Sequence, residues 1–217
     1  MRMLSAIIPA YNEEARIADT VRAVSCYVDE VIVVDDASHD DTAAVAEAAG
    51  ARVVRQPSNV GYIAAIKRGF REAQGDVVVT IDADGEFPAD AIPALVQPIL
   101  DGRADMVQGH RNVIPRPSER FLNALAHLRA DVGDSGTGLR ALRRDLALQL
   151  QLDGACICGI FTLEALYYGA RLVEVPVQLR SVDKPRCIAW YHLRQFFKLL
   201  PWVLWPGKMG DGEGGFA

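Results

Sequence analysis

The stretch Val77-Val78-Val79-Thr80-Ile81-Asp82-Ala83-Asp84-Gly85-Glu86 decides the fold. Its first five residues are an apolar, mostly β-branched run without polar alternation, which is typical of a strand buried on both faces of a parallel sheet. Two carboxylates follow at positions i and i+2, where that strand should end. Their oxygens would lie at one edge of the sheet as hard ligands, which a divalent cation carrying a diphosphate requires. The alternative is a plain turn, because Asp and Gly also favour turns.

Three further short apolar runs precede this stretch, and helical patterns lie between them. The predicted strands are Leu4 to Pro9, Val31 to Val34 and Arg52 to Arg55, and the predicted helices are Glu13 to Ser25, Asp41 to Ala49 and Tyr62 to Ala73. Strand and helix alternating at this spacing indicate right-handed βαβ units. The fold class is therefore α/β, with a Rossmann-like, mostly parallel sheet flanked by helices.

Polar residues follow three of the predicted strands. These segments are Pro9-Ala10-Tyr11-Asn12-Glu13, Asp35-Asp36-Ala37-Ser38 and Asp82-Ala83-Asp84. Each one alone could cap a helix, with Asn12 or Ser38 as the capping residue. Parallel strands end at the same edge of a sheet, and ligands bind beyond that edge. Together the three segments predict a nucleotide pocket.

The pattern loosens after residue 102. We expect a strand at Met106 to Gly109, helices at Glu119 to Ala130 and Phe161 to Gly169, an extended segment at Leu172 to Leu179, and a flexible polar loop at Asp134-Ser135-Gly136-Thr137-Gly138. The last predicted helix, Ile188 to Trp205, is amphipathic and aromatic-rich, and Pro201 should kink or end it early. Such a helix suits a membrane interface, although it could instead cover the sheet or mediate dimerisation. The glycine-rich tail, 207 to 217, is expected to be disordered.

Charge divides the chain into two unlike parts. Residues 1 to 102 hold 8 Lys and Arg against 17 Asp and Glu, and residues 103 to 217 hold 15 against 11. The first part suits a cation-bound ligand, and the second suits an anionic partner. Nucleic acid is not expected as that partner, because the basic residues are spread out and no nucleic-acid motif accompanies them.

Cysteine and histidine spacing predicts no metal site. The cysteines, Cys26, Cys156, Cys158 and Cys187, lack the paired spacing of a zinc site or a secreted disulfide framework. The four histidines, His39, His110, His127 and His192, are scattered along the chain. Reduced thiols in the cytoplasm are expected. No signal peptide and no apolar stretch near the ~18 residues of a membrane span is found, so we expect a protein that is soluble or rests on a membrane surface.

The ordered motifs resemble the inverting glycosyltransferases of family 2, which have the GT-A fold. The resemblance is carried by Ile7-Ile8-Pro9-Ala10-Tyr11-Asn12-Glu13-Glu14, Val33-Val34-Asp35-Asp36-Ala37-Ser38-His39-Asp40, Asn59-Val60-Gly61 and Asp82-Ala83-Asp84-Gly85-Glu86. In the second half, Gly109-His110-Arg111, Ser135-Gly136-Thr137-Gly138-Leu139-Arg140 and the run from Gly169 to Val177 are similar to the dolichol-phosphate mannosyltransferase group. The basic segment after Pro176 departs from that group, as does Glu86, where the group often has Gln.

That resemblance implies an activity and its partners. One sugar, mannose or glucose, would move from a GDP- or UDP-linked nucleotide sugar to a polyprenyl phosphate lipid. The enzyme would be peripheral on the cytoplasmic face of the membrane. Whether it has a membrane partner subunit is an open question at this point. Two alternatives remain at this point: a family 2 transferase acting on a hydroxyl of a glycan or small acceptor, and a non-catalytic nucleotide-sugar-binding subunit.

The resemblance also implies residue roles. Nucleotide-sugar contacts fall to Pro9, Tyr11, Glu13, Asp35, Asp36 and Asp82; Mg²⁺ or Mn²⁺ ligands to Asp82, Asp84 and Glu86; and acceptor-phosphate contacts to Arg111, Arg120, Ser135, Arg140 and Arg180. Catalytic roles fall to Asp84, Arg111 and Arg180, and to Asp134 as a base if the acceptor is a hydroxyl. The implied domain covers residues 1 to 186, divided at 102 into nucleotide-sugar and acceptor parts, and the amphipathic helix covers 187 to 206.

Overall fold

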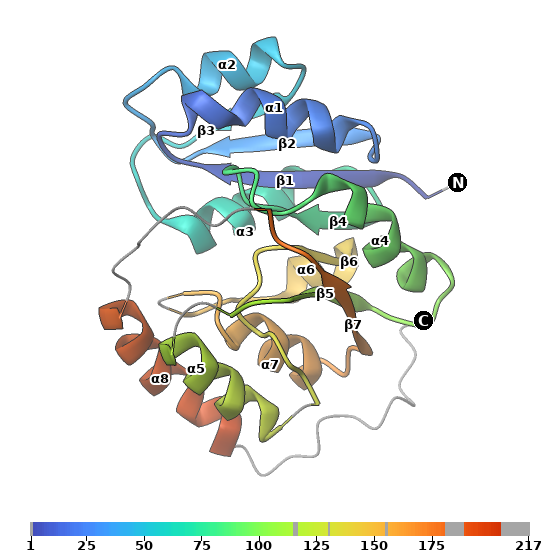
Figure 1. Cartoon of the computed structure of the whole chain (residues 1–217), viewed down its shortest axis with the longest axis vertical. Helices are drawn as coiled ribbons and strands as arrows, with labels where there is room; N and C mark the ends of the chain where they lie inside the picture. Colours follow the sequence, from blue (N-terminus) through green and yellow to red (C-terminus); the bar gives the residue numbers. More distant parts are fainter. Residues whose placement is uncertain (1, 115–116, 130, 155, 181–188, 205–217) are drawn as a thin grey trace.

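The computed structural model describes residues 2–114, 117–129, 131–154, 156–180 and 189–204. A seven-stranded sheet runs through this part of the chain in the order β3-β2-β1-β4-β6-β5-β7 (Figure 1). The strands are β1 Leu4–Ala10, β2 Glu30–Asp35, β3 Arg52–Arg55, β4 Val77–Thr80, β5 Met106–Arg111, β6 Arg140–Arg143 and β7 Leu172–Val177. Only β6 runs antiparallel to its neighbours among these strands. The predicted mostly parallel α/β sheet is confirmed.

Helices cover both faces of this sheet. They are α1 Glu14–Ser25, α2 Thr42–Ala48, α3 Tyr62–Glu72, α4 Ile92–Leu100, α5 Pro117–His127, α6 Arg144–Gln149, α7 Ile160–Tyr167 and α8 Ala189–Leu204, with a short 3-10 helix at Ala89–Ala91. Side chains of α1, α2 and α4 share one buried cluster with Ile8 of β1. Side chains of α3, α5, α6, α7 and α8 share another with Ile7. Alternate residues of β1 thus enter different cores, which explains why its sequence is apolar without alternation.

The strand β6 was not predicted. Its sequence, Arg-Ala-Leu-Arg, has only two apolar residues, too short a run to show strand periodicity. In the sheet Ala141 lies opposite Val79, and Leu142 lies opposite Val78. Tertiary pairing with the buried β4 therefore determines this strand. The helices α4 and α6 were also not predicted.

The predicted loop from Asp134 to Gly138 is present, but Asp134, Ser135 and Thr137 in it are fully buried. Its flexibility stays a prediction. The expectation that the proline at 201 ends the last helix early is wrong, because the helix continues to Leu204. A proline there removes one backbone donor close to the end of the helix, where little of the hydrogen-bond ladder remains to be interrupted.

The two predicted parts of the domain share one sheet. Strand β4, from residues 1 to 102, pairs with β6, from residues 103 to 186. The glycine-rich tail, 207 to 217, and the predicted boundary near residue 187 lie outside the described residues, so the domain limits stay predictions. Within the described ranges, each helix is either too short or too polar to cross a membrane.

Candidate active site at the carboxyl edge of the sheet

The loops after β1 and β2 are tied together at the carboxyl edge of the sheet. The Asn12 backbone N–H donates to Ser38 Oγ at 2.9 Å, and Asn12 Oδ1 accepts from the His39 backbone N–H at 2.9 Å. Asn12 and Ala37 have φ values of 55° and 62°, in the left-handed region that a residue with a Cβ seldom occupies. Asparagine enters this region readily, whereas alanine does so at a cost, so the surrounding contacts hold Ala37 there.

Asp36 anchors a third loop at the same edge. Its carboxylate, 4% exposed, accepts backbone N–H bonds from Val60 at 2.9 Å and Gly61 at 2.8 Å. Gly61 has φ +92°, which a residue with a side chain rarely adopts. The adjacent Asp35 is fully buried and accepts from the Ser38 backbone N–H at 3.1 Å and from Arg55 Nε at 3.2 Å. The Asn59-Val60-Gly61 motif is therefore held against the end of β2.

The remaining residues predicted to bind the nucleotide lie on or beside β1. Pro9 is in the strand, opposite Val34. Tyr11 is 40% exposed, and its ring stands edge-on to that of His39 with centroids 6.1 Å apart. Glu13 is buried and accepts from Arg16 Nε at 2.9 Å. The structure thus brings Pro9, Tyr11 and Glu13 to the same edge as Asp35 and Asp36, while their contacts with a nucleotide stay predictions.

Asp82, directly after β4, is held from two sides. Its Oδ1 accepts a 2.6 Å hydrogen bond from the Tyr62 hydroxyl. Burial, reinforced by the charge of Asp82, raises the pKa of Tyr62 well above its usual range, so the phenol stays a donor. On the other side, a Cβ added at Gly138 would lie 2.2 Å from Asp82 Oδ2. Glycine at 138 is therefore required for this position of the carboxylate.

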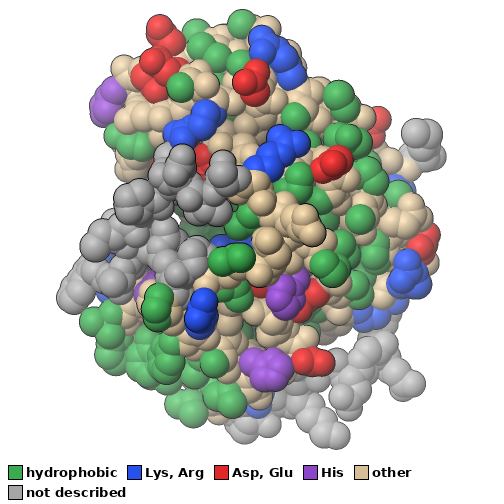
Figure 2. All heavy atoms as spheres, in the orientation of Figure 1, with side chains coloured by type: hydrophobic (Ala, Val, Ile, Leu, Met, Phe, Trp, Pro, Cys, Tyr) green, Lys and Arg blue, Asp and Glu red, His purple; other side chains and the backbone are tan. Residues whose placement is uncertain are grey.

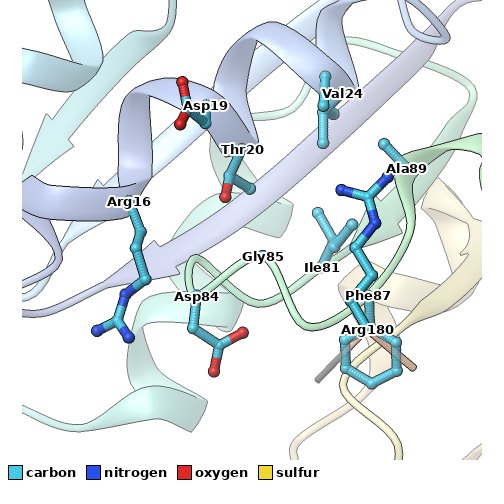
Figure 3. A pocket seen from close by; sticks show the side chains of 11 residues that line it. Arg16, Asp19, Thr20, Val24, Ile81, Asp84, Gly85, Phe87, Ala89 and Arg180 are labelled. Carbon is cyan, nitrogen blue, oxygen red and sulfur yellow. The ribbon is translucent and has the colours of Figure 1, made fainter. Parts of the chain in front are cut away.

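Asp84 lies in a groove beside this edge, with Arg16 of α1 and Arg180, which follows β7 (Figure 3). Its Oδ1 accepts from the Glu86 backbone N–H at 3.2 Å, and the Glu86 carbonyl accepts from the Arg180 backbone N–H at 2.9 Å. Gly85, with φ +73°, makes the turn between the two acidic residues. Tyr11 and Asp36 do not line this groove. It lies instead between α1, the turn at Gly85 and Arg180 after β7.

The acidic residues fit a hard divalent cation by their chemistry. Asp82, Asp84 and Glu86 offer only carboxylate oxygens, the ligands that Mg²⁺ and Mn²⁺ prefer. Within the described residues, however, the structure does not bring these three carboxylates within 4.8 Å of one another as a group. Their metal-binding role stays a prediction that rests on the chemistry of the donor set.

Arg111, at the end of β5, forms a buried ion-pair network. Its Nε lies 2.6 Å from Asp134 Oδ2, its Nη2 lies 2.8 Å from Asp134 Oδ1, and Nη2 also contacts Glu119 Oε2 at 3.2 Å. Burial alone would raise the pKa of Asp134, but the hydrogen bonds and charge of Arg111 outweigh it and lower that pKa. Burial likewise opposes the charge of Arg111, yet Asp134 outweighs it and raises the arginine pKa. Both groups are ionised at neutral pH.

Arg140, the first residue of β6, is a fully buried cation. Its Nη2 donates to the Ser135 carbonyl at 3.0 Å, and its guanidinium lies 4.5 Å from the centroid of the Phe161 ring. Burial lowers its pKa. The Nε and Nη1 atoms have no hydrogen-bond partner within the described part of the chain. Unpaired donors on a buried charge are costly, so Arg140 carries two donors in need of an acceptor.

The predicted phosphate-binding residues do not all meet in one place. Arg111 and Arg140 flank the segment from Asp134 to Gly138, where Ser135 Oγ donates to Asn123 Oδ1 at 2.6 Å. Arg120 is exposed on α5, and its Nε donates to the Ile114 carbonyl at 3.2 Å. Arg180 lies beside the acidic turn instead. Their roles toward an acceptor stay predictions.

Sequence reasoning missed two residues that position the site, Tyr62 and Glu174. Glu174 accepts from the backbone N–H groups of Gly133 at 2.9 Å and Asp134 at 3.0 Å, and from Gln108 Nε2 at 2.8 Å. Burial would raise its pKa, but these hydrogen bonds lower it overall. A signal existed for both. Tyr62 follows the Asn59-Val60-Gly61 motif, and Glu174 interrupts the apolar strand Leu172–Val177.

Comparisons with known proteins agree with this architecture. The family model for glycosyl transferase family 2 matches residues 5–163. The dolichol-phosphate mannosyltransferase of Pyrococcus furiosus is 29% identical over 229 residues, which cover 92% of this chain and 64% of the relative. The undecaprenyl-phosphate 4-deoxy-4-formamido-L-arabinose transferase of Aeromonas hydrophila is 33% identical over 164 residues, 67% of this chain and 50% of the relative. The chain thus spans one half to two thirds of the length of these relatives.

Solved structures give the same result. Glucosyl-3-phosphoglycerate synthase of Mycobacterium tuberculosis superimposes with a TM-score of 0.78 at 27% identity, over 93% of this chain and 81% of that one. A crystal structure of that synthase with Mn²⁺, UDP-glucose and phosphoglyceric acid superimposes with a TM-score of 0.77, over 93% of this chain and 80% of that one, at 26% identity. The GT-A fold expected from the motifs is confirmed by this agreement. Since the family model covers well over half of the sequence, the chain belongs to glycosyl transferase family 2.

Proposed function

We propose that this chain is a metal-dependent, inverting glycosyltransferase that moves one mannose or glucose from a GDP- or UDP-linked sugar to a polyprenyl phosphate. The observation that carries the proposal is the contact between the acidic edge and the arginine-bearing segment. Asp82 lies against Gly138, and Thr80 Oγ1 donates to the Gly138 carbonyl at 3.0 Å. Two residues further on, Arg140 begins β6. A donor bound at the acidic edge would therefore face the cationic half of the site.

The donor half would bind and orient the nucleotide sugar. Tyr11, Glu13 and Asp36 would contact base and ribose, with Pro9 and Asp35 shaping the edge behind them. Asp82, Asp84 and Glu86 would hold Mg²⁺ or Mn²⁺, which as a Lewis acid stabilises negative charge on the departing diphosphate. Tyr62 and Gly138 set the position of Asp82 beforehand, so the carboxylate need not reorganise when donor binds.

The acceptor half suits a nucleophile that already carries charge. A phosphate monoester has its second pKa near ~6, so at neutral pH it is largely a dianion and can attack without a base. Attack on the sugar carbon from the side opposite the diphosphate would invert its configuration. Arg111 would exchange its Glu119 contact for phosphate oxygens and keep its pair with Asp134. Arg140, Arg120, Arg180 and Ser135 are the further proposed contacts.

An exposed apolar face supports work at a membrane surface. We define the α5–α8 face as Phe121 and Leu128 with Leu193, Phe197 and Leu204, which are 50% to 74% exposed. Figure 2 shows hydrophobic side chains gathered over α5 and α8. The Phe121 and Phe196 rings lie 5.7 Å apart and join the two helices. Basic Arg194 and Lys198 are exposed on the same helix, and Lys198 is paired with Asp153 at 3.0 Å. The exposed Arg194 suits an anionic lipid surface.

A hydroxyl acceptor that bears a phosphate is the second candidate. The structural neighbour from Mycobacterium tuberculosis binds UDP-glucose and phosphoglyceric acid. In such a reaction Asp134 would have to remove the hydroxyl proton. The lowered pKa of Asp134 makes it a weak base, and Arg111 occupies both of its oxygens. The geometry therefore favours the acceptor that needs no base.

The experiment that tests this function follows labelled sugar from a panel of GDP- and UDP-sugars, with Mg²⁺ or Mn²⁺, into extractable polyprenyl phosphate. We expect label in the lipid phase that disappears with EDTA, and the donor that supplies it names the sugar. Parallel reactions contain phosphoglycerate or no acceptor. Label in a soluble phosphoglycerate product would show that the acceptor is a hydroxyl group and not the lipid phosphate. Donor binding without transfer to any acceptor would instead identify a non-catalytic subunit.

A further inference from the structure

Two cysteines and a histidine that no step of the proposed reaction uses come together beneath α8. The Sγ atoms of Cys156 and Cys158 and a ring nitrogen of His192 all lie within 4.8 Å of one another. In the described ranges, this is the one group of three such side chains gathered so closely. Cys158 and His192 are 5% and 3% exposed, so the group is shielded from solvent.

The spacing of these atoms matches a tetrahedral metal. Zinc with Zn–S near 2.3 Å and Zn–N near 2.0–2.1 Å places neighbouring sulfur and nitrogen ligands about 3.6 Å apart. Cys158 Sγ lies 3.8 Å from His192 Nε2. The other pairs need to close by no more than about 1 Å to reach the same geometry. Thiolate and imidazole are also the ligands that zinc prefers in proteins.

Neighbouring groups hold the His192 ring and the backbone of both cysteines. His192 Nδ1 lies 2.6 Å from Ser118 Oγ, so when Nδ1 donates to that hydroxyl, Nε2 keeps its lone pair toward the sulfurs. Gln195, one turn along α8, accepts from the Cys156 backbone N–H at 3.1 Å and donates to the Cys158 carbonyl at 2.9 Å. Metal-ligating histidines usually have such a partner on the second ring nitrogen.

Contact between the two thiols shifts their pKa values in opposite directions. The hydrogen bond with Cys158 lowers the pKa of Cys156. The same bond, together with burial, raises the pKa of Cys158 well above its usual range. A bound cation needs both sulfurs as thiolates, so metal binding releases the protons that the two thiols carry.

We propose that Cys156, Cys158 and His192 bind one Zn²⁺ ion that fastens α8 to the segment before α7. The ion would lie close to the acceptor half, because a Cβ at Gly136 would meet Cys158 Sγ at 3.3 Å and Arg111 Nη2 at 3.2 Å. No redox change accompanies binding; the two thiols release their protons to solvent. The site is independent of the proposed transfer reaction, since its test measures metal and not turnover.

The test titrates the full chain, freed of metal and kept reduced, with Zn²⁺ against a chromophoric chelator. We expect one tightly bound Zn²⁺ per chain, and with Co²⁺ the thiolate charge-transfer absorption and intense visible bands of a tetrahedral ion. Cys158→Ser and His192→Gln should abolish this binding. Ser118→Ala should weaken it about 10- to 100-fold, as loss of a partner to a ligating histidine does. Cys26→Ser removes an exposed thiol outside the group and should leave binding unchanged.

Cys156→Ser repeats the test at a half-buried position, in case Cys158→Ser does not fold, and circular dichroism checks the fold of each variant. Much less than one Zn²⁺ per wild-type chain would overturn the proposal. So would zinc binding that survives in both folded Cys→Ser variants. A disulfide between Cys156 and Cys158, found after alkylation of thiols at lysis, would identify a redox pair in place of a metal site.

Discussion

Single side chains set the geometry of the acidic edge. Asp82 is positioned by a donor, Tyr62, and by the absence of a side chain at Gly138. Asp84, two residues on, lies in the groove with its carboxylate near the turn at Gly85. The two carboxylates therefore have different surroundings, and substitutions at each should have different consequences.

Replacing Asp84 by alanine should abolish metal-dependent transfer with little loss of stability. Loss of a metal ligand removes several kcal/mol of charge stabilisation, so we expect kcat to fall by more than about 100-fold. The free energy of unfolding should fall by about 1 kcal/mol, because the hydrogen bond from the Glu86 backbone N–H is lost. Initial rates at saturating Mn²⁺ and urea unfolding provide the two measurements. Asp19→Ala, in the same groove but with an 89% exposed side chain, is the control. Turnover like wild type in Asp84→Ala would remove the metal argument.

Tyr62→Phe and Gly138→Ala both act on Asp82 without changing it. The first removes a hydrogen bond to a carboxylate, worth about 1.5 kcal/mol, and should weaken donor affinity about tenfold. The second places a Cβ where the carboxylate now lies and should weaken affinity further, because Asp82 must move. Calorimetric titration with the nucleotide sugar and Mn²⁺ measures both. Tyr27→Phe, at an exposed tyrosine, is the control. Equal affinities in all four proteins would show that Asp82 does not contact the donor complex.

At the scale of elements, the segment from Gly133 to Arg140 joins the two halves of the site. Its residues are hydrogen-bonded to β5 through Arg111, to α5 through Asn123, and to β7 through Glu174. Because most of these residues are buried, the segment acts as part of the core, although its composition is that of a surface loop. The free energy of unfolding should therefore depend on the ionisation state of the acidic side chains in this segment.

Acid should destabilise this segment through Asp134. Its pKa is lower in the folded chain than the ~3.9 of an unfolded one, so its stabilising contribution is complete above about pH 5 and is lost as the pH falls through the folded pKa. Asp134→Asn should flatten that part of the curve of unfolding free energy against pH. At pH 7 it should cost about 3 kcal/mol, because Arg111 keeps only Glu119 as a buried partner. Urea unfolding between pH 3 and 7 measures both. Asp131→Asn, at a fully exposed carboxylate whose 3.8 Å contact with His127 is also exposed, should change the curve far less.

At the scale of the whole molecule, one face of α8 packs into the core and the other is exposed. His192, Gln195 and Leu199 point into the core, and Leu193, Phe197 and Leu204 are exposed. Helix α5 packs beside it and extends the apolar surface. A face of this kind, next to the half of the site proposed for a lipid phosphate, would bring the acceptor and the catalytic edge together.

Phe197→Glu should weaken binding to vesicles of anionic phospholipid. Insertion of a phenylalanine side chain is worth about 1.5–3 kcal/mol, so we expect affinity to fall by about 10- to 100-fold in a sedimentation assay. Leu148→Glu introduces the same charge at an exposed leucine of α6, away from the α5–α8 face, and should bind like wild type. If the two variants bind equally well, the face does not dock on lipid and a protein partner or a second copy becomes the better occupant.

The sequence by itself determined the fold from β1 to β4, although not helix α4. Strands β1 to β4 and helices α1 to α3 were predicted to within about two residues, because strands buried on both faces must be apolar throughout and the helices between them carry a 3.6-residue pattern. The acidic residues at the ends of β1, β2 and β4 followed from topology, since parallel strands end at one edge. The order of strands and helices along the chain was sufficient to predict this part of the site.

Only the tertiary structure decided the rest, because the relevant contacts join residues far apart in the chain. Strand β6 exists through its pairing with β4. In the loop before it, Asp134 and Ser135 are buried and donate backbone hydrogen bonds to Glu174 and Asn123. Asp134 and Arg111 are 23 residues apart and share one ion pair. Cys158 and His192, 34 residues apart with no recognisable spacing between them, meet at 3.8 Å. Local patterns record which residues are apolar and where strands end, but not which polar side chains are buried against one another.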